Sequence, residues 1–269
     1  MRQIAHSYLN QDMSSIDQNL RELNKIQDLQ QRSHWMNDLH PLGKLLISII
    51  YIFLIASFGG YDIAPLILMA IYLVFTFLIG DLSLKEGLYR MRLILPLVMF
   101  VGIFNPFLDT KTVLYIGSIP VSGGVISMIT LIIKGLYCVL AAYALIATTS
   151  IDDICYALRC LKVPKIIVIV IMLIYRYFDV MAQEAVRITT AYRLRAPSQK
   201  GIHYKAWGTL VGQWLLRSMD RAEMVYESML LRGFNGEFSF NNKKVTPIDI
   251  IYPLIWATIL IIIRCRILL

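Results

Sequence analysis

Two arginines, each near the end of a predicted helix, are the residues of this chain best suited to binding chemistry. Arg195 is followed by Ala196 and Pro197, and Arg232 is followed by Gly233. A guanidinium group is planar, always charged, and presents a fixed fork of donors to carboxylates and carbonyls. Alternatively, each arginine stabilises the dipole of its own helix end by about 0.3–1 kcal/mol, with Gly233 as a C-cap. Lysine would serve that purpose equally well, so both interpretations stay open and docking of a partner protein is slightly favoured.

The sequence carries no motif for catalysis. A phosphate-binding Walker A loop needs an upstream glycine and a Ser or Thr, and the nearest fragment, 43–45, lacks both. The histidines lie outside metal-ligand spacing and the cysteines form no CxxC pair. These residues are His6, His34, His40, His203, Cys138, Cys155, Cys160 and Cys265. We therefore expect a non-enzymatic chain with reduced cysteines and with no catalytic residue, metal site or cofactor.

The composition indicates an integral membrane protein in contact with the lipid bilayer. Hydrophobic residues make up 57% of the chain and charged residues 16%, whereas soluble domains have roughly 45–50% and about 25%. The net charge of +8 would suit a nucleic acid. Basic residues of membrane proteins, however, collect on the cytoplasmic side and fix orientation, so no nucleic-acid partner is expected. Residues 1–40 are polar and show no cleavable signal peptide.

Five apolar runs qualify as transmembrane helices. A span needs roughly 20 mostly apolar residues, so the third and fifth runs must include flanking residues. The predicted architecture is an all-α polytopic membrane protein with about five transmembrane helices. The runs are 45–61, 63–80, 93–108, 125–150 and 248–263.

The distribution of basic residues predicts which segments face the cytoplasm. Region 179–247 holds ten Lys or Arg against six Asp or Glu, and the loop 81–92 is also basic. The positive-inside bias places both in the cytoplasm. The apolar decapeptide 166–175 must then stay on the inner side, because crossing would put the basic region outside. This topology leaves the C-terminus outside with Arg264 and Arg266, which conflicts with the same bias.

The cytoplasmic region is expected to contain amphipathic helices, because apolar residues recur at spacings of three and four. A short helix over 151–162 has Thr149 or Ser150 as its N-cap. The first long helix has a stripe of Tyr177, Met181, Ala185, Ile188 and Tyr192, and the second has one of Trp207, Val211, Trp214, Ser218, Ala222, Val225 and Met229. The predicted parts of the chain are an N-terminal cytoplasmic extension (1–40), transmembrane helices one to four (41–150), cytoplasmic coupling helices (151–244) and a C-terminal transmembrane helix (245–269).

Lys134 is the one ionisable residue deep inside a predicted span. Ionisable residues within the membrane are costly and commonly functional. Lys134 is a candidate for a polar pathway or for an intramembrane contact between helices. The alternative is that it reaches an interface or pairs locally.

At these helices the sequence resembles the T component of energy-coupling factor (ECF) transporters, the EcfT/CbiQ family. The resemblance covers about 200 of the 269 residues. The residues that carry it are 39–45 (LHPLGKL), Thr148-Thr149-Ser150, Val163-Pro164, Tyr175-Arg176-Tyr177, Glu184, Arg217-Ser218 and 221–236 (RAEMVYESMLLRGFNG).

The resemblance implies a membrane scaffold that joins a substrate-binding membrane S component to two ABC-type ATPases in a bacterial or archaeal plasma membrane. In the family, two coupling helices each carry a short motif, usually Ala-Arg-Gly, that docks on an ATPase. The second motif matches as Leu231-Arg232-Gly233, and the first corresponds to Leu194-Arg195-Ala196, without the glycine. The sequence of residues 221–229 is similar to that of cobalt-type members of the family. This similarity implies uptake of cobalt, another metal ion or a vitamin.

Two rival functions remain open from the sequence. A stand-alone secondary transporter would have broken helices near the midplane, for which Lys134 and the Pro-Gly region 119–124 are the support. A membrane-anchored protein could bind acidic lipid or nucleic acid through its basic region. The acidic residues Asp220, Glu223 and Glu227, interleaved with the basic ones, argue against the second rival.

Overall fold

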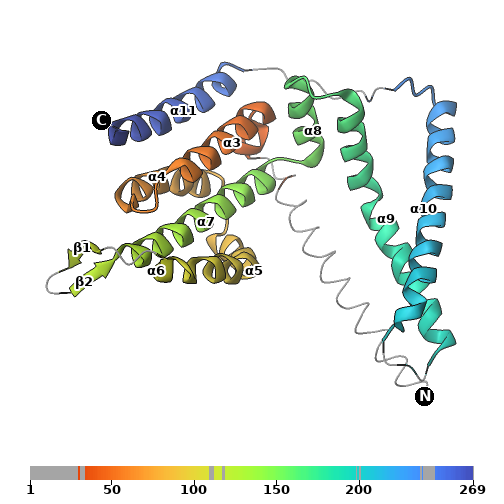
Figure 1. Cartoon of the computed structure of the whole chain (residues 1–269). Coiled ribbons are helices and arrows are strands. Elements are labelled where there is room, and N and C mark those ends of the chain that lie inside the picture. The colour runs from red at the N-terminus through yellow and green to blue at the C-terminus, as the bar shows by residue number, and fades with distance from the viewer. Residues whose placement is uncertain are drawn as a thin grey trace. The chain divides into compact units, whose positions relative to one another are not determined.

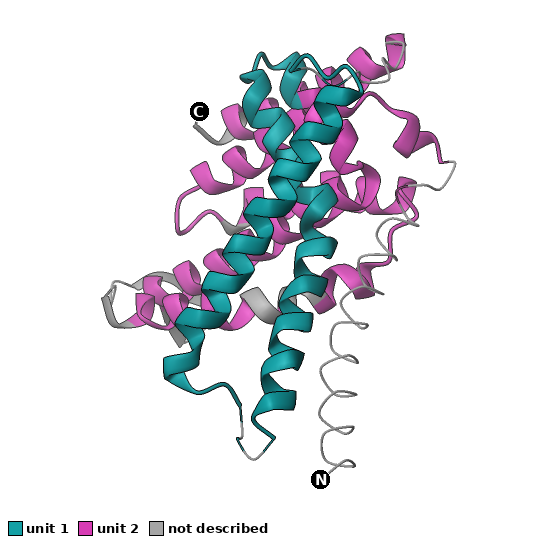
Figure 2. Ribbon diagram, turned by 90° about the vertical axis from the view of Figure 1, so that its right-hand side faces the viewer, with its two compact units in different colours: residues 1–25, 158–241 teal, residues 26–157, 242–269 magenta. Residues whose placement is uncertain are grey.

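The computed structural model describes residues 30, 34–108, 112–116, 119–197, 199, 201–236, 238 and 246–268. These residues fold into helices and one short pair of strands (Figure 1). The chain divides into two compact units, shown in different colours in Figure 2. We call residues 26–157 and 242–269 the core unit, and residues 1–25 and 158–241 the long-helix unit.

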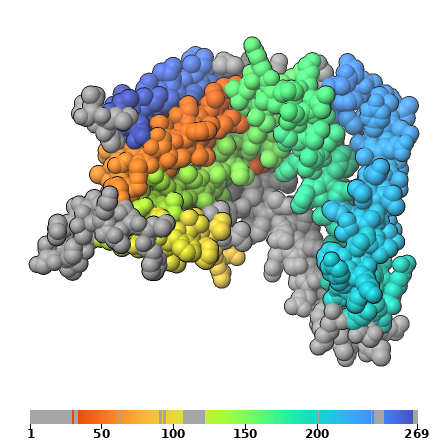
Figure 3. All heavy atoms as spheres, in the orientation of Figure 1, coloured from red at the N-terminus to blue at the C-terminus, as the bar shows by residue number. Residues whose placement is uncertain are grey.

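The core unit is a bundle of apolar helices around α7 (Gly123–Thr148). Helices α3 (Pro41–Ser57), α4 (Ile63–Ile79) and α5 (Leu84–Ile103) pack against α7, and α11 (Pro247–Leu268) packs against α3 and α4. Side chains fill the space between α3, α4 and α7 (Figure 3). Aromatic rings lie at the centre of the bundle: the ring centroids of Tyr51 and Tyr72 are 4.6 Å apart, and those of Tyr72 and Trp256 are 5.2 Å apart.

Three helices of the described residues are long and apolar enough to cross a membrane. They are α7, the Pro247–Cys265 part of α11, and α9 (Lys165–Arg195); the apolar helices Pro41–Ser57 and Ala64–Ile79 are shorter. The prediction of an all-α polytopic membrane protein is confirmed. Helix α9 continues the apolar decapeptide 166–175 without a break, and its expected place on the inner side stays a prediction, as do the number of crossings and the four predicted parts.

The segment expected to be a basic loop, 81–92, is largely helical. Helix α5 begins at Leu84, directly after its N-cap Ser83, and continues through Pro96. The basic residues from Lys85 onward therefore lie on the first turns of a helix, since helical structure does not require an apolar residue at every position. The expected third helix thus starts nine residues earlier than the apolar run 93–108.

A short antiparallel pair of strands follows α5 and α6 (Asn105–Leu108). The strands are β1 (Thr112–Ile116) and β2 (Ile119–Ser122). Val, Ile, Thr and Tyr favour strands because their branched or aromatic side chains suit a pleated surface. The Pro-Gly region 119–124 is therefore the second strand and the start of α7.

The long-helix unit contains α9 and α10 (Tyr204–Leu231), which run antiparallel and are joined by residues 196–203 (Figure 1). Helix α8 (Ile151–Cys160) precedes them. Ser150 is its N-cap, because the Ser150 Oγ accepts a hydrogen bond from the Asp153 N–H at 3.1 Å. Of the two caps left open by the sequence, the structure selects Ser150. The short helix α2 (Trp35–Asp38) precedes α3 in the core unit.

Candidate docking site

The candidate site is formed by the two ends of the α9–α10 pair that carry the arginines. Helix α9 has 31 residues and α10 has 28, so they are about 46 and 42 Å long. Arg195 is the last residue of α9 and Arg232 is the C-cap of α10. Because the helices run antiparallel, the two arginines lie at opposite ends of the pair, roughly 40 Å apart.

The Arg232 end of α10 closes in a Schellman motif. The N–H of Gly233 donates to the Leu230 carbonyl and the N–H of Phe234 donates to the Met229 carbonyl, both at 2.9 Å. The motif requires a left-handed residue after the C-cap, and Gly233 has φ +79°. Leu231 is 90% exposed and Arg232 is also exposed. The helix therefore ends by presenting these two side chains to its surroundings.

The Arg195 end of α9 closes differently. Ala196 has φ −126° and ψ 62°, and its N–H donates to the Tyr192 carbonyl at 3.1 Å. The Tyr192 hydroxyl donates to Gln199 Oε1 at 2.8 Å and accepts from the His203 N–H at 3.3 Å. The connection to α10 is thereby tied to the helix end. Because the backbone at Ala196 has a negative φ, this end needs no glycine, and the departure from the Ala-Arg-Gly pattern fits the local geometry.

The arginine side chains themselves are available for binding. Leu194 and Arg195 are exposed, as are Leu231 and Arg232. Neither guanidinium makes a hydrogen bond or ion pair with any residue that the structure describes. Stabilisation of the helix dipole needs no such contact, so docking of a partner by Arg195 and Arg232 stays a prediction.

Gly233, just after α10, and Gly208, in the interior of α10, offer a test of the Schellman end. An added Cβ would meet no atom within 4 Å at Gly233 or at Gly208 in the helix interior. We expect Gly233→Ala to destabilise α10 by about 1–2 kcal/mol, because an L-residue resists positive φ. Gly208→Ala should instead stabilise it by about 1 kcal/mol. Thermal unfolding of the helices, followed by circular dichroism in detergent, measures both; equal shifts in the same direction would contradict the motif.

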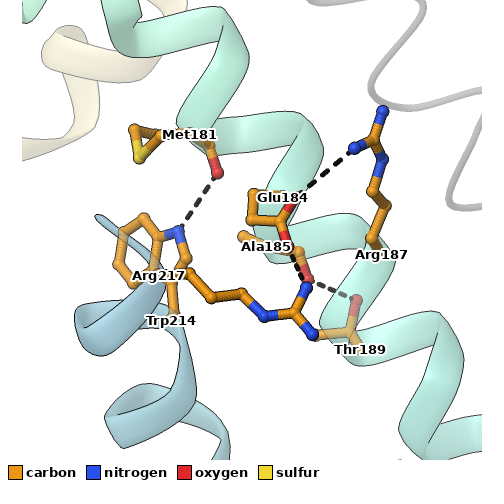
Figure 4. A network of polar contacts seen from close by, with 7 residues as sticks. All are labelled: Met181, Glu184, Ala185, Arg187, Thr189, Trp214 and Arg217. Atoms are coloured by element: carbon orange, nitrogen blue, oxygen red, sulfur yellow. Dashed lines mark hydrogen bonds and ion pairs between the residues drawn. The ribbon is translucent and has the colours of Figure 1, made fainter. Parts of the chain in front are cut away.

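Two polar contacts tie α9 to α10 midway along the pair (Figure 4). The Arg217 guanidinium forms an ion pair with the Glu184 carboxylate, and the Trp214 indole N–H donates to the Met181 carbonyl at 3.2 Å. The Arg187 guanidinium also contacts Glu184, at 3.5 Å, from the same helix. The Glu184 side chain is 18% exposed and that of Arg217 is 56% exposed. Ion pairs of this exposure typically stabilise a fold by about 0–1 kcal/mol. This pair therefore acts mainly by fixing the position of α10 against α9.

An apolar groove of about 990 Å³ runs between α9 and α10. Most members of the two predicted stripes line this groove, although Trp207 does not. Tyr177, Met181 and Ala185 come from the first stripe, and Val211, Trp214, Ser218, Ala222, Val225 and Met229 come from the second. Ile188 is buried and Tyr192 binds the connection, so neither is in the groove. The Met229 and Phe234 side chains of the Schellman end line its wall.

A family model for cobalt transport proteins, CbiQ, matches residues 32–244, which is most of the chain. This chain belongs to the CbiQ family. Among relatives, two uncharacterized proteins of Methanocaldococcus jannaschii, MJ1571 and MJ1089, are each 26% identical to it. The alignments cover 81% of this chain and 78% of the first relative, and 76% of this chain and 79% of the second. As a CbiQ-family member, the chain is a membrane component of a transport system and works in a complex.

A buried lysine in the core unit of this CbiQ-family chain was not recognised from the sequence. The Lys44 ammonium donates to the Thr148 carbonyl at 2.8 Å, the Met36 carbonyl at 3.1 Å and the Asn37 carbonyl at 3.3 Å. It thus holds the start of α3 against the end of α7. A lysine at the first turn of an apolar helix gives no signal of this, because its acceptors are backbone groups.

A second buried polar group, Asp249, fixes the start of α11, and its role was not recognised from the sequence. Its carboxylate accepts from the His40 N–H and from the Thr246 N–H and hydroxyl, each at 2.7 Å. Asp249 is buried, and carboxylates that accept several such bonds keep their charge. The beginnings of α3 and α11 are therefore joined at the end of the core unit that also contains Lys44.

Lys134 makes an interhelical contact. Its ammonium donates to the Phe58 carbonyl at the C-terminus of α3. Arg264 of α11 reaches the same helix end, donating to the Ser57 carbonyl at 2.8 Å and lying over the Phe58 ring at 4.6 Å from its centroid. Two cations thus meet the negative end of the α3 dipole. Lys134 thus contacts the end of another helix, and its part in a polar pathway stays a prediction.

The described residues contain neither a disulfide nor a cluster of metal-ligating side chains. All four cysteines are free, and no group of three metal-ligating side chains occurs in the described part of the chain. Burial, with a smaller contribution from Asp152, raises the pKa of the Cys155 thiol on α8. This thiol therefore stays protonated at neutral pH and behaves as a small apolar side chain.

Proposed function

We propose that this chain is the energy-coupling T subunit of an ECF transporter. In this role it receives ATP-driven motion from two ABC-type ATPases and passes it to a substrate-binding membrane subunit. The observation that carries the proposal is the pair of exposed arginines at opposite ends of the α9–α10 pair, neither of which binds a described residue through its guanidinium. Two docking ends roughly 40 Å apart suit two ATPase subunits, one at each end.

In the proposed mechanism each arginine fork binds carboxylates or carbonyls on one ATPase. Closure of the ATPase pair on ATP then displaces one end of the helix pair relative to the other. The apolar groove between α9 and α10 offers the substrate-binding subunit a surface that moves with them. That subunit tilts and releases its cargo. The family points to cobalt as the transported ion, and uptake of radioactive cobalt by cells with and without this chain tests it.

The rival functions have less support. A secondary transporter needs broken helices around a central site, but residues 119–122 form a strand and α7 continues unbroken from Gly123 to Thr148. Lys134 is engaged with the α3 end. For a nucleic-acid or lipid binder the basic residues should form one continuous patch, whereas Arg195 and Arg232 lie at separate ends.

Substitution by lysine separates docking from helix capping. Arg195→Lys and Arg232→Lys keep the charge at each helix end, so the stability of α9 and α10 should not change. Each substitution removes the planar fork, and we expect recovery of the ATPases with the purified chain to fall about tenfold. The measurement is affinity purification from native membranes with quantitative mass spectrometry. Full recovery of the ATPases with both lysine variants would leave capping as the role of the arginines.

A further inference from the structure

The polar contacts between Glu184 and Arg217 lie between the two docking ends. Glu184 precedes Arg195 by 11 residues along α9, and Arg217 precedes Arg232 by 15 residues along α10. At the helical rise these separations are about 16 and 22 Å. One contact point therefore divides the pair into two arms, one carrying each arginine.

Most of the remaining interface between the two helices is apolar. The groove from Ile169 to Ala185 on α9 and from Val211 to Met229 on α10 is lined almost entirely by hydrophobic and aromatic side chains. Apolar contact is non-directional, so it resists separation of the helices more than sliding or rotation. An ion pair and an indole–carbonyl hydrogen bond are directional and fix one point.

We propose that the Glu184–Arg217 ion pair, with the Trp214–Met181 hydrogen bond beside it, is the pivot on which α10 turns against α9 (Figure 4). Glu184 and Arg217 are positioning residues. They convert displacement of the Arg232 end into displacement of the opposite arm and of the groove. The inference rests on the proposed function, because a pivot has a purpose only if the two ends are driven.

The chemistry of the pair suits this role. The Glu184 carboxylate is mostly shielded, whereas the Arg217 side chain is half exposed. Arg187 contacts the same carboxylate from within α9 and keeps its charge compensated when α10 moves. Loss of the pair therefore leaves both helices folded but removes the fixed point between them.

A charge-swap series tests the pivot in the reconstituted transporter. The variants are Glu184→Arg, Arg217→Glu and the double swap, with Glu223→Arg, a charge reversal at an exposed position of α10 outside these contacts, as the matched control. Substrate uptake and ATP hydrolysis are measured in the same proteoliposomes. We expect each single reversal to retain both ATPases but to lower uptake per ATP hydrolysed by at least about tenfold, and the double swap to recover most of it. The control should retain normal coupling.

A pair of spin labels tests the pivot in the isolated chain, independently of any ATPase. Labels on cysteines replacing the exposed Ile166 of α9 and Leu230 of α10 report the separation of the two helices at the Arg232 end, in a chain whose four native cysteines are alanine. We expect a narrow distance distribution, a broad one with Glu184→Arg, and a narrow one again with the double swap. An unchanged distribution in Glu184→Arg overturns the pivot. If the wild-type chain purified from native membranes brought no ATPases with it, the proposed function would be overturned instead. The distances measured in the isolated chain would still decide the pivot.

Discussion

We expect Arg232→Glu, and separately Arg195→Glu, to abolish recovery of the ATPase subunits while the chain itself stays in the membrane at its normal amount. A carboxylate at either end removes the fork and repels the acidic groups that an arginine binds. Removing one partner of a desolvated charge pair costs about 2–5 kcal/mol of binding free energy, which lowers the affinity by more than about tenfold. The measurement is quantitative mass spectrometry of the complex purified from native membranes.

The matched control for these reversals is Lys205→Glu. Lys205 is exposed in the first turn of α10, next to the Arg195 end. A carboxylate is favourable at a helix N-terminus, so this reversal changes the charge without weakening α10. If Lys205→Glu lowered ATPase recovery as strongly as Arg195→Glu, general electrostatics would explain the effect. Normal recovery with both arginine variants would contradict docking at the helix ends.

The second large effect is expected at Lys44, which is 3% exposed. Methionine matches lysine in length but donates no hydrogen bond, so Lys44→Met leaves the carbonyls of Thr148, Met36 and Asn37 without this donor. Each unsatisfied buried carbonyl costs about 1–3 kcal/mol. We expect a loss of several kcal/mol in the stability of the core unit and little folded protein at 37 °C. Thermal unfolding followed by tryptophan fluorescence in detergent measures it.

Lys85→Met provides the comparison for this experiment. Lys85 is exposed on the first turn of α5, so the same substitution there should leave the unfolding temperature nearly unchanged. An unfolding temperature for Lys44→Met equal to that of Lys85→Met would mean that water, rather than the ammonium, satisfies the three carbonyls.

Local periodicity predicted the long-helix unit well. The spacing of three and four residues placed Met181 and Ala185 on one stripe and Trp214 and Ser218 on another, and both stripes line the same groove. Such patterns depend on residues close in sequence, where helical geometry alone decides which side chains share a face. The same local reasoning placed Arg195 and Gly233 at helix ends.

Contacts between residues that are far apart in the sequence could not be predicted from it. Lys44 and its acceptor Thr148 are separated by 104 residues, and Lys134 and Phe58 by 76. Their acceptors are backbone carbonyls, which every residue possesses and which carry no signal in the side-chain pattern. The start of α5 at Leu84 was missed for a related reason: a basic first turn is as compatible with a helix as with a loop.

The different closures of the two helix ends have a consequence for how this protein can diverge in evolution. With φ at −126°, position 196 does not require glycine, so its backbone admits L-amino acids other than proline. Position 233, at φ +79°, is restricted to glycine or, with some strain, asparagine. Natural variants should therefore accumulate changes after the first arginine while the residue after the second stays fixed, and a survey of orthologues would count them.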